Sequence, residues 1–264
     1  MIDIQSTEIK SKFEIDSTGI LNLVYPITVL DNRGDSQEVQ RQSAKWKLGV
    51  SLSKEQRGTH MSRFIEVLNK MCDGPVSLDD FFKLCNEVRT YLGSRNVNVE
   101  AEFTWLRKVA APVSRLEGYV NCQVGFSGRI KGEVEEKVLS VEIPATALCP
   151  CSKAISARGA HNQRAFIKAD IFLNPKSVSP SINKIIQILE NSASSAIYPI
   201  LKREDEKYVT ELAYDNPSFV EDLARKVATE LFDLPAFEKF KVRVINQESI
   251  HNHDCYAEVV YSRS

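Results

Sequence analysis

The sequence predicts an α+β protein built on antiparallel sheets that carry helices on one face. Three observations lead to this class: strand-like runs follow one another directly, helix-like runs are grouped between them, and the order ββααββ occurs twice in the 264 residues. The second copy begins near Gly128–Gly132. We therefore expect two domains, residues 1–129 and 130–264, with most candidate functional residues in the second.

In the first half, extended stretches are expected at about residues 20–30 and 38–52, and a helix follows them. This helix is predicted from apolar residues at helical spacing, which are Met61, Phe64, Ile65, Leu68 and Met71. Asp73-Gly74-Pro75 ends it, and a second helix is expected from Ser77. Strands near 97–109 and 116–128 complete the half.

In the second half, a half-buried strand is predicted where Leu139, Val141 and Ile143 alternate with polar residues. A strand at 163–173, helices near 181–201 and 217–232, and strands near 239–247 and 254–262 follow. The charged run at 202–211 is interpreted as a solvated stretch. Antiparallel sheets of this kind have open edges, and oligomerisation is one way to cover them.

Composition excludes several classes of partner. The chain has 34 basic and 35 acidic residues and a net charge of −1, so electrostatics gives no support for a nucleic-acid or membrane partner. Its apolar runs are shorter than the roughly 20 residues that a membrane helix needs. We expect a cytoplasmic protein, in which the six cysteines stay as thiols or bind metal.

The run from Cys149 to Arg164 is the most informative stretch, because it holds two thiols and one of only four histidines. Soft and borderline ligands gathered in this way indicate a transition-metal site. Pro150 is expected to fix an extended backbone, so that Cys149 and Cys151 point apart and one of them is the ligand. We favour Cys149, which follows a strand directly. Neighbouring antiparallel strands would bring it close to His161, after a turn that Gly159 permits.

A second cluster contains Glu248, His251 and His253. In an extended segment the two histidines share a face, and imidazole titrates near neutrality, so they are candidate ligands or proton carriers. A solvated polar loop is the alternative. Glu221 lies in the first turn of a helix, where the dipole alone explains a carboxylate. Arg63 lies near another helix start, where phosphate could bind.

Four separated segments resemble a known family. They are Ala147–Lys153 with Gly159–Arg164, Gly58–Phe64, Asp205–Glu211 and Glu248–His251. Together they are similar to the signature of type IB GTP cyclohydrolase I, and the resemblance spans nearly the whole chain. It implies a tunnelling fold (T-fold) with two ββααββ modules per chain. It also implies a homotetramer with active sites at subunit interfaces.

The resemblance further implies conversion of GTP to 7,8-dihydroneopterin triphosphate and formate, the entry to tetrahydrofolate and, in many bacteria, to queuosine. A divalent metal, Zn²⁺ or Mn²⁺, would be held by Cys149, His161 and Glu206. Glu221 would bind the guanine edge, and we expect His251 and His253 to move protons, with Glu248 orienting one of them. Candidate cations for the triphosphate are Arg63, Lys153, Arg164, Lys202 and Arg203.

Two alternatives remain at this point. A nitrile reductase of the same fold, on the queuosine path, would use a cysteine nucleophile and a nicotinamide cofactor. A non-catalytic module with a structural zinc would close four protein ligands around the ion and lose its fold on chelation.

Overall fold

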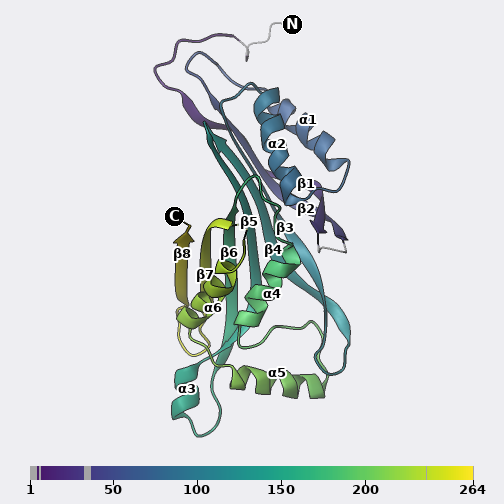
Figure 1. Ribbon diagram of the computed structural model, residues 1–264, viewed down its shortest axis with the longest axis vertical. Coiled ribbons are helices and arrows are strands. Elements are labelled where there is room, and N and C mark those ends of the chain that lie inside the picture. The colour runs from purple at the N-terminus through teal and green to yellow at the C-terminus, as the bar shows by residue number, and fades with distance from the viewer. Residues whose placement is uncertain (1–4, 6, 33–36, 236, 264) are drawn as a thin grey trace. The chain divides into compact units, whose positions relative to one another are not determined.

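The computed structural model describes residues 5, 7–32, 37–235 and 237–263 (Figure 1). Within these residues it contains eight strands and six helices. The strands are β1 Ile15–Asn32, β2 Gln37–Leu52, β3 Asn96–Ala110, β4 Glu117–Lys131, β5 Val134–Leu148, β6 Asn162–Leu173, β7 Phe237–Gln247 and β8 Cys255–Ser262. The helices are α1 Met61–Cys72, α2 Leu78–Tyr91, α3 Pro150–Ile155, α4 Ile182–Ser192, α5 Arg203–Asp215 and α6 Val220–Phe232.

The predicted α+β class is confirmed. The strands form a single sheet in the order β1-β2-β3-β4-β5-β6-β7-β8, where several sheets were expected, and the β1–β2, β2–β3 and β7–β8 pairs are antiparallel. Each strand therefore lies beside its neighbour in sequence. The first half has the predicted order ββααββ, whereas the second half adds α3 and α5. No helix in the described part of the chain is both long and apolar enough to cross a membrane.

The chain divides into two compact units. The first unit comprises Met1–Thr104, Gly125–Leu139 and Phe172–Ser179, and the second comprises Trp105–Val124, Ser140–Ile171 and Pro180–Ser264. Strands β3, β4 and β5 thus contribute residues to both units. The two predicted domains, residues 1–129 and 130–264, were based on a repeated order of elements in the sequence. Their boundary stays a prediction.

The first unit has a core of aromatic and aliphatic side chains beneath two helices. Helices α1 and α2 lie side by side in Figure 1, and α1 packs on β1. Trp46 of β2 stacks on Phe81 of α2 with 5.7 Å between ring centres, and Phe126 meets Phe81 edge-on. A capping box between Ser77 and Asp80 begins α2 at the predicted residue.

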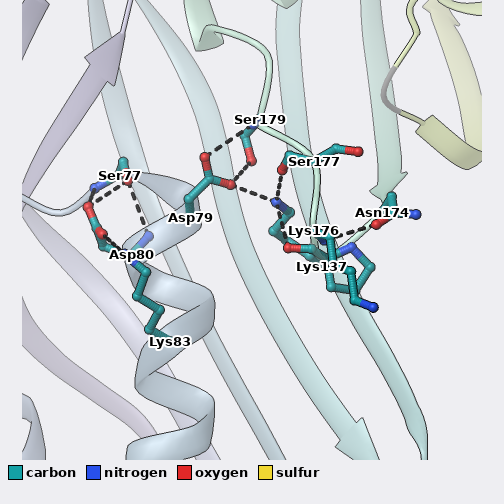
Figure 2. A network of polar contacts seen from close by, with 10 residues as sticks. Ser77, Asp79, Asp80, Lys83, Lys137, Asn174, Lys176, Ser177 and Ser179 are labelled. Carbon is teal, nitrogen blue, oxygen red and sulfur yellow. Dashed lines mark hydrogen bonds and ion pairs between the residues drawn. The ribbon is translucent and has the colours of Figure 1, made fainter.

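One charged side chain lies inside the first unit. Lys137 of β5 is 1 % exposed, and its ammonium donates to Asp79 Oδ1 at 2.6 Å and to the carbonyl of Ser177 at 2.6 Å (Figure 2). Asp79 also accepts from the Ser179 hydroxyl at 2.6 Å and from its backbone N–H at 3.2 Å. A buried charge with this many partners costs little and ties β5, α2 and residues 174–179 together.

In the second unit, the predicted alternation of β5 is confirmed, since Val141, Ile143 and Ala145 are at most 1 % exposed. Helix α6 packs on β7 and β8. The helix predicted at 181–201 is too long, because α4 ends at Ser192. Beyond it the chain pairs with β5: Thr146 N–H donates to the Ser195 carbonyl, and Ser194 N–H donates to the Thr146 carbonyl, both at 3.0 Å. These bonds replace continued helical ones.

Residues 202–211 are mostly exposed, as expected for a solvated stretch, but they form most of α5, which was not predicted. Asp205 is fully buried and caps this helix, accepting from the backbone N–H of Lys202 at 2.9 Å. It also accepts from the N–H of Val113 at 2.8 Å and from the Ser114 hydroxyl at 2.6 Å. These hydrogen bonds lower the pKa of Asp205 well below its usual range, although burial alone would raise it. The charged sequence therefore contains a buried anchor.

Candidate active site

The second unit contains a cavity of about 470 Å³ where strand ends meet the first turn of α6. Its wall includes Cys149 after β5, Gln163 near the start of β6, Asn246 near the end of β7, Cys255 at the start of β8, and Glu221 of α6. Glu248 also lines it. The cavity thus gathers candidates that lie up to about a hundred residues apart in sequence.

Cys149 and Cys151 are separated in a way that the sequence did not predict. Pro150 is the first residue of α3, and Cys149 is the residue that precedes this helix, with φ −71° and ψ 119°. The fixed φ of proline suits the first helical position, so it starts a helix rather than extending the chain. As a result, Cys149 lines the cavity, whereas Cys151 is exposed.

The expected proximity of Cys149 and His161 is confirmed at the backbone. Cys149 N–H donates to the His161 carbonyl at 3.1 Å, and His161 N–H donates to the Ser152 hydroxyl at 3.2 Å. The intervening turn contains Gly159 with φ +92°, a conformation that favours glycine. The thiol and the imidazole therefore come from residues that lie side by side where β5 ends and β6 begins.

A chain of side chains holds the His161 ring. Its Nδ1 lies 2.8 Å from Gln163 Oε1 and 3.3 Å from the Ser249 hydroxyl. Gln163 Nε2 in turn donates to Glu248 Oε1 at 3.0 Å. An imidazole whose Nδ1 is held by such a partner presents Nε2, which is the usual arrangement of a metal-binding histidine.

Cys149 and His161 fit a divalent metal in their chemistry, as a soft thiol and a borderline imidazole. Among the described residues, no group of three or more His, Cys, Asp or Glu side chains is arranged to hold an ion. Glu206, the expected third ligand, is exposed in the first turn of α5. Its role as a ligand stays a prediction.

The cavity wall carries three carboxylates, those of Glu221, Glu248 and Asp254. Burial raises the pKa of the Cys255 thiol, and the carboxylates of Glu248, Glu221 and Asp254 raise it further, with Glu248 also accepting its hydrogen bond. Cys255 is therefore a neutral thiol at neutral pH and not a nucleophile. Cys255 was not among the candidate residues predicted from the sequence, but the structure places it in the cavity wall.

Other predicted residues lie outside the cavity wall. The rings of His251 and His253 stack at 5.1 Å between centres, in an exposed bend rather than in the extended segment expected. Lys153 donates to the Tyr214 carbonyl and lies 4.1 Å from the centre of its ring, and Arg164 is exposed on β6. Arg63 belongs to the first unit, on α1 beside Tyr91.

Sequence reasoning missed two buried polar residues, Gln163 and Asn246. Each occupies one end of an otherwise apolar row: Gln163 precedes Ala165 and Ile167 on β6, and Asn246 follows Val242 and Val244 on β7. They are 9 % and 2 % exposed. An amide that interrupts strict apolar alternation at a strand end is the signal that could have found them.

Comparison with known proteins identifies the family. The model of the family described as type I GTP cyclohydrolase folE2 matches residues 1–257. The chain belongs to this family. A GTP cyclohydrolase FolE2 from Magnetococcus marinus is 42 % identical over 255 residues, covering 97 % of this chain and 94 % of the relative. The FolE2 of Kosmotoga olearia is 38 % identical over the full length of both chains.

Among solved structures, this member of the folE2 family is similar to a uricase from Arthrobacter globiformis. The TM-score is 0.56 with 9 % identity, and the match covers 94 % of this chain and 93 % of the uricase. At that identity the likeness concerns the fold alone. It agrees with the α+β class predicted from the sequence.

Proposed function

We propose that this chain is a GTP cyclohydrolase I of type IB, which opens the imidazole ring of GTP and releases formate and 7,8-dihydroneopterin triphosphate. The observation that carries the proposal is the adjacency of His161 to Cys149, which lines a cavity together with Glu221 and Glu248. Membership of the folE2 family over residues 1–257 agrees with it. The nitrile reductase and the zinc module have no comparable support.

The carboxylates of the cavity wall suit the donor edge of guanine. Glu221 accepts from the guanine N1–H and from the exocyclic amine, which would exclude adenine because its edge presents an unmatched acceptor. Glu221 also lies in the first turn of α6, where the helix dipole favours an acidic side chain. Arg63, Lys153, Arg164, Lys202 and Arg203 stay candidates for the triphosphate.

A divalent metal, Zn²⁺ or Mn²⁺, would be held by Cys149 and His161, with Glu206 as the proposed third ligand. When bound, the metal would supply Lewis acidity. This would lower towards neutrality the pKa of the water that reacts at C8 of the purine. Gln163 and Glu248 keep His161 in the orientation this requires. These two residues act on the reaction by positioning.

The hydrolysis and later ring closure move protons at several atoms, so groups that titrate near neutrality are needed. His251 and His253 are the proposed carriers, because their stacked, exposed rings can exchange protons with solvent. Glu248 is proposed to orient one of them in addition to its bond with Gln163.

The proposed assembly is a homotetramer of tunnelling-fold chains, each with modules at residues 1–129 and 130–264. Edge strand β8 supports association, because Tyr256 is 66 % and Val260 is 59 % exposed on it. The proposed location is the cytoplasm.

The function is tested by incubating the purified protein with GTP and either Mn²⁺ or Zn²⁺. We expect stoichiometric formate and, after oxidation, pterin fluorescence, with neither product from ATP. Absence of formate with both metals would overturn the proposal. Oxidation of NADPH with a nitrile substrate would replace it with the reductase.

A further inference from the structure

Helix α3 lies between the two proposed metal ligands, Cys149 and His161, and hydrophobic packing does not hold it in place. It comprises Pro150–Ile155, and none of these six residues is buried. A helix of this length is not stable by itself, so its position depends on specific contacts. Two polar side chains of α3, those of Ser152 and Lys153, make such contacts.

Ser152 connects the backbones of the two proposed ligands. Its hydroxyl donates to the Cys149 carbonyl at 3.1 Å and accepts from the His161 N–H at 3.2 Å. A serine hydroxyl has one hydrogen to donate, and here it is used on a ligand backbone. Cys149 N–H donates in turn to the His161 carbonyl at 3.1 Å. Three hydrogen bonds therefore close a ring through Cys149, Ser152 and His161.

The chain on either side of this ring is restrained by other contacts. Leu148 N–H donates to the Ser194 hydroxyl at 3.1 Å, and the Leu148 carbonyl accepts from the Ser218 N–H at 3.0 Å. Lys153 donates to the Tyr214 carbonyl and lies 4.1 Å from the centre of the tyrosine ring, which ties α3 to α5. Between these two anchors, the hydroxyl of Ser152 fixes the ligand backbones relative to each other.

We propose that Ser152 is a positioning residue for the metal, because its hydroxyl fixes the ligand backbones in one arrangement before the ion binds. This inference rests on the proposed function, since it takes Cys149 and His161 as the ligands. Ligands that are fixed in advance bind more tightly, because less conformational freedom is lost on binding. Without the hydroxyl, the Cys149 carbonyl still accepts from the Lys153 N–H at 3.2 Å, whereas the His161 N–H loses its acceptor. The loss therefore acts mainly on His161.

The test measures Co²⁺ binding to the metal-stripped protein from the near-ultraviolet absorption of the cobalt–thiolate bond. Loss of this band in Cys149→Ala assigns it to the Cys149 thiolate. We expect Ser152→Ala to raise the Kd for Co²⁺ about 10-fold, as for loss of other contacts that orient metal ligands. The thermal midpoint of the metal-free variant should change by less than about 2 °C, because α3 is not buried. A purely structural role would lower this midpoint and leave the Kd unchanged.

Ser152→Thr and Ser152→Val form a matched pair, because both new side chains are β-branched and only threonine keeps the hydroxyl. The threonine variant should restore the wild-type Kd, and the valine variant should bind Co²⁺ as weakly as Ser152→Ala. This pair decides the question if the alanine variant does not fold. Ser156→Ala is the control within the same connection, since the Ser156 hydroxyl accepts from the Arg158 N–H and contacts neither ligand. Its Kd for Co²⁺ should equal that of the wild type.

Equal Kd values for Co²⁺ in the wild type and Ser152→Ala, or in the threonine and valine variants, overturn the inference while the proposed metal site stands. An equal loss of affinity in Ser156→Ala overturns it as well. If the wild-type protein gives no cobalt–thiolate band, Cys149 is not a ligand and the proposed function itself has failed. These failures are distinguishable, because the first two require the band in the wild type.

Discussion

Lys137 and Asn246 are both polar side chains placed in the buried row of a strand, and their surroundings differ. Lys137 has its charge paired with Asp79 and two carbonyls within 3.5 Å, so its donors are used inside the protein. Asn246 has an amide oxygen without a partner in the part of the chain that the structure describes. A polar residue in an otherwise apolar row of a strand is therefore fully paired in one case and left with an unpaired oxygen in the other.

The difference indicates how to separate stability from binding in this protein. A buried polar group with all its partners inside the fold holds elements together. Its removal destabilises the fold, because the partner then stays buried without its counter-charge or hydrogen bond. A buried polar group without a partner adds no stability, so its presence needs another explanation. The same distinction separates the first unit around Lys137 from the cavity in the second unit.

The largest expected effect is the loss of activity on substitution of Cys149 or His161, the two proposed metal ligands next to the strand ends. Cys149→Ala and His161→Ala should each abolish formate release, a loss of at least about 10³-fold, because the metal contribution to catalysis is lost. Both variants should also lose metal while the thermal midpoint changes little, measured by elemental analysis and calorimetry. Cys151→Ala is the control, since that thiol is exposed and should leave both properties intact. Normal turnover by either variant would sink the ligand assignment.

The next largest effect is expected at the buried ion pair between Lys137 and Asp79. Lys137→Met should lower the free energy of unfolding by about 3 kcal/mol, because it leaves Asp79 without its ion pair. Asp79 is 34 % exposed, which keeps the cost at the low end of that expected for a buried pair. Urea denaturation measures the change.

Lys83→Met is the matched control for this variant, since Lys83 pairs with Asp80 at 2.8 Å but is 73 % exposed. It should change stability by less than about 0.5 kcal/mol. Equal losses in the two lysine variants would show that burial of Lys137 is irrelevant to stability.

A smaller effect is expected at Glu221. Glu221→Gln replaces an acceptor oxygen by an amide donor and should raise the Kd for GTP roughly 10- to 100-fold. Metal content should stay unchanged, because Glu221 is not a proposed ligand. Elemental analysis of the purified variant gives the decisive comparison, and loss of metal there would mean that its assigned role is wrong.

The smallest effect is a pH dependence of the stability that the Lys137–Asp79 pair contributes. Burial alone would raise the pKa of Asp79, but hydrogen bonds from Lys137 and Ser179 outweigh it and lower this pKa below its usual value. Since the folded-state pKa is the lower one, the stabilisation is complete above the usual pKa of about 3.9 and is lost as pH falls through the folded value. The stability difference between wild type and Asp79→Asn should therefore narrow on acidification below about pH 4 in urea titrations. A difference that widens there would contradict the assignment.

Much of the fold could be predicted because its signals are local. The alternation of β5 and the stripe of α1 depend only on period, and both elements occur within a few residues of the expected bounds. The end of α4 and the formation of α5 could not be predicted in this way. Ser194 leaves the helix to pair with Thr146, and Asp205 is buried by the backbone of Val113 and Ser114. These partners are tens of residues away.

The candidate site divides in the same manner. Cys149 and His161 could be placed together because they stand at the two ends of one connection between neighbouring strands. Gln163, Asn246 and Cys255 were missed, because an amide or a thiol in a strand carries no local sign of the cavity that it lines.

The sequence by itself determined the α+β class, the order of strands and helices in the first half, the resemblance to type IB GTP cyclohydrolase I, and the neighbouring positions of the thiol and the imidazole. Only the tertiary structure decided that Asp205 and Lys137 are buried and paired, and that Asn246 lines the cavity while its amide oxygen is buried without a partner in the described part of the chain. The physical reason is that period and spacing act along the chain, whereas burial and hydrogen-bond satisfaction depend on residues that folding brings from elsewhere.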